Sequence, residues 1–85
     1  MKTGVIVYVR NGDSSQISDE KNALQRLGLS ADRVDLVFSG ESAYDLWDSW
    51  WKLTRKGMHR IVCQTAEISG NALRLTGKEM QLRAV

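Results

Sequence analysis

The amino-acid sequence predicts a small α/β domain with a parallel three-stranded sheet in the order 2-1-3. Segments rich in β-branched and aromatic residues alternate with segments of helical periodicity, and glycines follow both expected helices. A strand–helix–strand–helix–strand order folds as two right-handed βαβ units, which place the first strand between the other two and stack the helices in a two- or three-layer domain. No linker or repeat interrupts the 85 residues, so one domain spanning 1–85 is expected.

The first strand and the first helix are marked by a change from apolar to polar sequence. Gly4–Arg10 contains the run "VIVYV", which is typical of a strand buried on both faces and therefore central. Asp13 and Gln16 have the spacing of a capping box for a helix. That helix should begin near residues 14–16 and end at Gly28.

The next three elements repeat this pattern. Residues 33–38, "RVDLVF", form the expected second strand. Ser42 is the expected N-cap of a second helix, which should run to Lys56 before the stop at Gly57. Residues 59–64, "HRIVCQ", supply the third strand.

Residues 66–85 leave two alternatives open. Apolar and polar residues alternate over 72–75 and again over 80–83, and the turn-like "TGKE" between them favours a C-terminal β-hairpin. The alternative takes Thr76 and Glu79 as the capping box of a short terminal helix.

Composition narrows the function classes. Twelve basic and ten acidic residues are interspersed along the chain, so the net charge of +2 gives no basic stripe that would by itself indicate a nucleic-acid binder.

Cys63 is the only cysteine, which excludes an internal disulfide and fits a reducing compartment. The longest apolar run is too short to span a bilayer, so we expect a cytoplasmic protein without membrane association. His59, the single histidine, has no nearby cysteine or second histidine, and we expect neither a metal nor a cofactor.

Several short motifs resemble one known family. Tyr8, Arg10 and Gln16 match the first strand and following loop of the catalytic domain of serine recombinases, the resolvase and invertase family, whose strand carries Tyr-x-Arg-Val-Ser. The segments "NALQRLG", "FSG", "KG" and "RIVC" follow in the same order and with nearly the same spacing. The resemblance covers about residues 4–70 and leaves open whether descent or a shared layout explains it. It implies an α/β fold and, in an intact member, phosphoryl transfer on DNA through a serine nucleophile.

The same comparison implies that the chemistry is absent. Gly12 stands where the family has its nucleophilic serine, and residues 66–70, "AEISG", stand where it has Asp-Arg-Leu-x-Arg. Nucleophile and phosphate-neutralising arginines are therefore both missing. The family's long dimerisation helix and DNA-binding domain have no counterpart in the remaining residues. We expect a catalytically inactive, degenerate core that acts as an interaction or accessory module rather than an enzyme.

Two places remain as candidate sites. The loop after the first strand is a candidate anion site, because a helix N-terminus together with cationic and hydroxyl side chains favours phosphate or carboxylate. Its members are Arg10, Asn11, Gly12, Ser14 and Ser15. The alternative is that this loop is only a turn and a helix cap. If the loop does bind phosphate, the protein would be a weak phosphate or nucleic-acid binder.

The second candidate is the stretch "YDLWDSWWKL", whose apolar arc is broader than packing on one sheet requires. Its aromatic residues, the candidate interface, are Tyr44, Trp47, Trp50 and Trp51. Either the side with Leu46, Trp50 and Leu53 or the side with the other aromatics should face the sheet. The remaining edge would then contact a second copy in a dimer or another protein partner. The alternatives are that all three tryptophans are core or half-buried edge residues, or that they stack on bases, which usually requires a basic groove.

Overall fold

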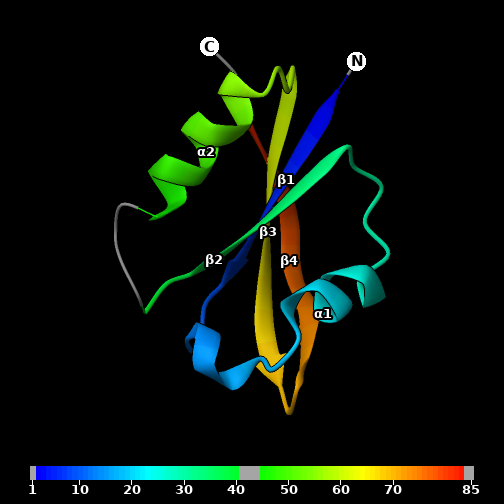
Figure 1. The fold of residues 1–85 in the computed structure, drawn as a ribbon, viewed down its shortest axis with the longest axis vertical. Helices are drawn as coiled ribbons and strands as arrows, with labels where there is room; N and C mark the ends of the chain where they lie inside the picture. Colours follow the sequence, from blue (N-terminus) through cyan, green and yellow to red (C-terminus); the bar gives the residue numbers. More distant parts are fainter. Residues whose placement is uncertain (1, 41–44, 84–85) are drawn as a thin grey trace.

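A mixed sheet of four strands forms the middle layer of the molecule, with one helix on each face (Figure 1). The computed structural model describes residues 2–40 and 45–83. In chain order the elements are β1 (Thr3–Val9), the 3₁₀ helix η1 (Ser14–Gln16), α1 (Glu20–Arg26), β2 (Arg33–Phe38), α2 (Asp45–Arg55), β3 (Arg60–Ser69) and β4 (Ala72–Arg83).

The sheet has the strand order β2-β1-β3-β4. β1 pairs in parallel with β2 on one side and with β3 on the other, so the predicted central position of the first strand is confirmed. The prediction of a purely parallel sheet is wrong, because β4 pairs antiparallel with the outer side of β3. β3 continues to Ser69, beyond its predicted end at Gln64, and Gly70, with φ of 64°, turns the chain directly into β4.

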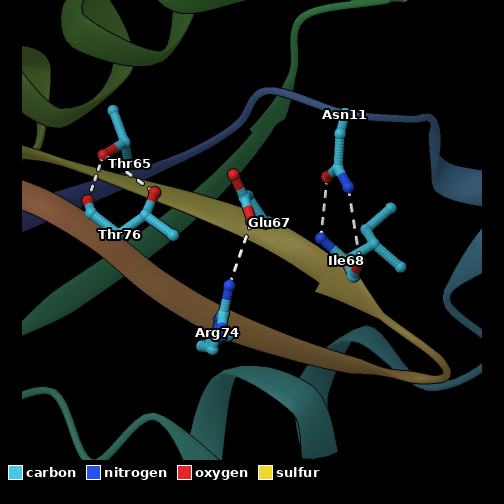
Figure 2. A network of polar contacts seen from close by, with 6 residues as sticks. All are labelled: Asn11, Thr65, Glu67, Ile68, Arg74 and Thr76. Atoms are coloured by element: carbon cyan, nitrogen blue, oxygen red, sulfur yellow. Dashed lines mark hydrogen bonds and ion pairs between the residues drawn. The ribbon is translucent and has the colours of Figure 1, made fainter.

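Residues 72–83 form one strand rather than the predicted separate hairpin or terminal helix. Pairing passes from Cys63 opposite Met80 to Thr65 opposite Thr76, which leaves residues 77–79 of β4 facing residue 64 of β3. Gly77 has φ of 70° in this bulge, and the Thr65 hydroxyl donates a hydrogen bond to the Thr76 carbonyl (Figure 2). The "TGKE" segment is therefore a β-bulge inside a strand and not a turn between two strands.

The predicted first helix is divided in two. The capping box of Asp13 and Gln16 is present, but it closes only the three-residue η1. Ile17 then adopts an extended conformation, with φ of −116° and ψ of 110°, and is buried. A second cap follows, in which the Asp19 carboxylate accepts a hydrogen bond from the Asn22 amide and starts α1. Burial of Ile17 between two caps therefore breaks the helix predicted from Ser14 to Gly28.

The two helices cover opposite faces of the sheet, as the alternation of β1 requires. Val5, Val7 and Val9 belong to the core cluster on the α1 face. Ile6 points the other way and packs with Leu53 under α2. The prediction of a first strand that is apolar on both faces is thus confirmed. α2 ends close to its predicted stop at Gly57, which has φ of 82°, whereas the predicted cap at Ser42 lies outside the described residues.

Candidate functional site

α2 packs on the sheet with only one side of its apolar arc. Leu53 and Trp50 are 2% and 9% exposed and belong to the core cluster, and Leu46 packs against it. Trp47 and Trp51 are instead 57% and 40% exposed. The structure therefore selects the first of the two orientations that the sequence left open. The alternative that all three tryptophans are core or half-buried edge residues holds for Trp50 and describes Trp51, but it does not hold for Trp47, which is more than half exposed.

A buried polar contact fixes the rotation of α2. Ser49 is 3% exposed and donates a hydrogen bond to the Asp35 carboxylate of β2. Lys52 lies 3.8 Å from the same carboxylate oxygen. Helical periodicity places Ser49 on the polar side of α2 together with Asp48 and Lys52. Its side chain is nevertheless buried, because a small hydroxyl can be buried when it has a partner. With the Ser49 side turned toward β2, the exposed tryptophans lie away from this edge strand.

The three indole rings form one cluster. Trp47 and Trp50 stack with centroids 5.1 Å apart and an interplanar angle of 22°. Trp51 is nearly perpendicular to both, at 6.0 Å and 84° from Trp47 and at 5.2 Å and 74° from Trp50. One face of Trp47 is thus covered by a buried ring, so its exposed area must come from the opposite face and the edges. Tyr44, the fourth residue of the candidate interface, lies outside the described residues.

The exposed tryptophans border an open groove of about 510 Å³ along the outer side of α2. The groove is lined by Trp47, Asp48, Trp51, Lys52, Arg55 and Lys56. Three cationic side chains and one carboxylate therefore surround an aromatic wall. The sequence reasoning missed this groove, although the basic residues could be read from the last turn of the expected helix. It also missed Met80 on β4, a further exposed apolar side chain at 63% exposure.

The loop after β1 is closed by its own side chains. The Asp13 carboxylate accepts hydrogen bonds from the amide and the hydroxyl of Ser15, and the Gln16 side chain accepts one from the Asp13 amide at 2.9 Å. Arg10 is exposed and Ser14 is half-buried, so the predicted anion-site residues do lie along one short loop. However, an aspartate carboxylate already occupies the Ser15 amide that would bind an anion. This geometry favours the alternative in which the loop is a turn and a cap.

Asn11, another residue of the predicted anion site, bonds to the neighbouring strand instead. Its side-chain oxygen accepts from the Ile68 amide at 2.8 Å and its side-chain nitrogen donates to the Ile68 carbonyl at 3.3 Å (Figure 2). The amide group of Asn11 therefore continues the pairing of β1 with β3 beyond the last backbone bond, which the Arg10 amide donates to the Ala66 carbonyl.

Gly12 has a packing reason to be glycine. A Cβ atom at this position would overlap the Gln16 side-chain oxygen and lie 2.8 Å from the Ile68 side chain. A serine at this position would have to displace the Gln16 side chain, which accepts the capping hydrogen bond from the Asp13 amide, and the end of the Ile68 side chain. The family's arginine-bearing segment was expected to follow the third strand, but Ala66 through Ser69 lie within β3, which corrects that expectation. Glu67 in this segment pairs with Arg74 of β4 at 3.3 Å (Figure 2).

Other chemical groups are sparse. Among residues 2–40 and 45–83, no three His, Cys, Asp or Glu side chains gather in a way that could hold a metal ion. Cys63 is a free thiol whose pKa is raised by burial, so it is less reactive than an exposed cysteine. The helices in the described part of the chain are too short and too polar to cross a membrane.

Comparison with known proteins identifies no relative. The chain matches no family model, no curated protein and no solved structure.

Proposed function

We propose that this domain is a non-catalytic, self-associating interaction module whose layout resembles the serine-recombinase core. The observation that carries the proposal is the exposure of Trp47 and Trp51 on a helix whose Trp50 and Leu53 already fill the core. Large exposed aromatic residues that are not needed by the core are characteristic of interaction surfaces.

The exposed area is sufficient for a weak dimer. A tryptophan side chain offers about 150–250 Å² of surface, so the exposed fractions of Trp47 and Trp51 leave on the order of 200 Å² of indole in water. Burying this area in both copies contributes about 10 kcal/mol at about 25 cal/mol per Å². Association costs about 4–15 kcal/mol in lost motion, so a dimer forms only if the cost is near the lower end of this range, where the dissociation constant is tens of micromolar or weaker. A two-fold arrangement is favoured, because it brings the same patch of both copies together.

The absence of catalysis is proposed from the loop and from β3. A recombinase needs a nucleophile and cations around the transferred phosphate. Gly12 cannot supply the nucleophile, and Glu67 places a carboxylate in the segment that the family equips with arginines. The single half-buried thiol of Cys63 is consistent with a cytoplasmic location, which forms part of the same proposal.

Sedimentation equilibrium from about 1 μM to several hundred micromolar tests the proposal. Wild type should pass from monomer to dimer across this range, and Trp47→Ala should raise the dissociation constant about 30-fold, as expected for an interface hot spot. Lys78→Ala, which changes an exposed residue of β4, is the matched control and should leave the constant unchanged. A wild-type protein that stays monomeric throughout would refute self-association.

A further inference from the structure

We propose that the groove along α2 is a binding site for single-stranded nucleic acid, with one base stacked on Trp47 and the backbone phosphates held by Arg55 and Lys56. The proposal goes beyond self-association, because it assigns a ligand to the charged side of the groove. It uses a different site from the loop after β1, whose Ser15 amide is already bonded within the loop.

Self-association does not account for the cations of the groove. Lys52, Arg55 and Lys56 line it together with the single carboxylate of Asp48. Burial of the tryptophans in a two-fold contact does not require cations around them, and repulsion between the like charges limits how tightly the two copies associate. Basic residues in the last turn do stabilise the helix through its dipole. That role does not require them to line the same groove as two exposed tryptophans.

The aromatic wall has the geometry of a stacking platform. Trp50 covers one face of Trp47 at 5.1 Å and holds the ring in place, while more than half of Trp47 stays exposed. Trp51 stands at 84° to Trp47 and lies nearer Trp50, so it supports the stacked pair from the side that Trp50 covers. A flat ring can therefore lie on the free face of Trp47. Every nucleobase offers such a ring, and stacking of this kind tolerates any sequence.

The charges indicate an anionic partner that is aromatic as well. Lys52 is exposed but pairs with Asp35 at 3.8 Å. Arg55 and Lys56 are therefore the cations of the groove that form no ion pair with a carboxylate among the described side chains. Backbone phosphates can pair with these cations, and unpaired bases can stack on the tryptophans. A single strand therefore contacts both parts of the groove. A duplex hides its base faces, and an acidic peptide carries charge without a ring at each position.

The strand and a second copy of the protein compete for Trp47. Nucleic acid that fills the groove should therefore shift the protein toward monomers. The two proposals remain separable, because the strand can bind to a monomer.

Anisotropy titrations with fluorescein-labelled oligomers test the site. The probes are a thymidine oligomer of about ten nucleotides, within the usual site size, an abasic phosphodiester of the same length, and a duplex of the same length. The thymidine oligomer should bind at least fivefold more tightly than either control, because each stacked base contributes that factor or more. The logarithm of affinity should fall with the logarithm of salt with a slope of about −1.4, the value for two phosphates on a single strand.

Matched variants assign the binding to the groove. Trp47→Ala should weaken binding at least fivefold, whereas Trp47→Phe should keep most of it. The double variant Arg55→Gln with Lys56→Gln should remove most of the salt dependence. Its control, Lys21→Gln with Lys78→Gln, removes two exposed cations from α1 and β4 and should retain the slope.

Several results would overturn the proposal. Equal binding of the abasic oligomer would show phosphate attraction alone, and equal competition by polyglutamate would show a general preference for acidic chains. Unchanged binding by Trp47→Ala, or no binding of the thymidine oligomer at about 50 mM salt, would exclude the site. A wild-type protein that is monomeric but binds the oligomer as expected would refute only self-association. A wild-type protein that dimerises but does not bind the oligomer would refute only the nucleic-acid site.

Discussion

Replacing Asn11 by alanine separates its structural role from the anion-binding role that the sequence predicted. In the structure the Asn11 side chain exchanges two hydrogen bonds with the main chain of Ile68. Each such bond contributes about 0.5–1.5 kcal/mol, and both lie at an exposed end of the β1–β3 pairing, so the variant should lose about 1–2 kcal/mol of unfolding free energy. For a domain of this size, each lost kcal/mol lowers the melting temperature by about 4–8 °C.

Thermal and urea denaturation measure the stability change, and amide hydrogen exchange locates it. The Ile68 amide should lose protection in Asn11→Ala, because its acceptor is the Asn11 side chain at 2.8 Å. Asn22→Ala is the matched control: Asn22 is exposed on α1, and alanine there should be neutral or slightly stabilising.

Phosphate supplies the second comparison. If Asn11 helped to bind an anion, phosphate would raise the melting temperature of wild type more than that of Asn11→Ala, since a ligand stabilises only the state that binds it. We expect the same small increase in both proteins. A melting temperature and Ile68 exchange rate that are unchanged by the substitution would refute the structural role, and a phosphate effect lost only in the variant would restore the anion site.

Three further outcomes are expected. Trp50→Ala should lower the free energy of unfolding by about 3–5 kcal/mol because Trp50 is 9% exposed, whereas Trp47→Ala, at a residue 57% exposed, should lower it by about 1 kcal/mol in a dilute monomer. Urea denaturation measures both losses, and equal losses would contradict the assigned orientation of α2. Gly12→Ser should lower the free energy of unfolding, because a Cβ atom there overlaps the Gln16 side chain. Neither this variant nor wild type should form a covalent adduct with supercoiled DNA, and a trapped phosphoserine linkage would contradict the proposal that the domain is non-catalytic. Burial raises the pKa of the Cys63 thiol, so less thiolate is present at pH 8 in the native protein. Iodoacetamide should therefore react more slowly with native than with urea-unfolded protein, and equal rates would argue against this burial.

The elements that the sequence predicted well are those defined by short, strong patterns. The apolar side chains of β1 are removed from water only if both faces of the strand are covered, which requires a central strand between two helical layers. The end of α2 is fixed by a glycine with positive φ at Gly57, a signal that local sequence carries. The existence of a broad aromatic arc on α2 could be predicted from periodicity as well.

The features that were missed depend on contacts distant in the sequence. "TGKE" has the composition of a turn, and only the pairing of β4 with β3 shows that Gly77 lies in a bulge. Ile17 is one apolar residue between two capping aspartates, and its burial against the sheet decides that the helix is broken there. Which tryptophans are exposed depends on the contact of Ser49 with Asp35, fourteen residues away along the chain.

The bulge in β4 also limits aggregation through the edge of the sheet. β4 is an outer strand of twelve residues, long enough to template the edge-to-edge polymerisation that leads to fibres. Residues 77–79 interrupt its regular pleat, and Lys78 and Glu79 are exposed there. An incoming strand would meet a kinked ladder and two charges instead of a flat edge. Straightening β4 by deleting residues of the bulge should therefore make the protein prone to aggregation, even where the shortened strand still folds.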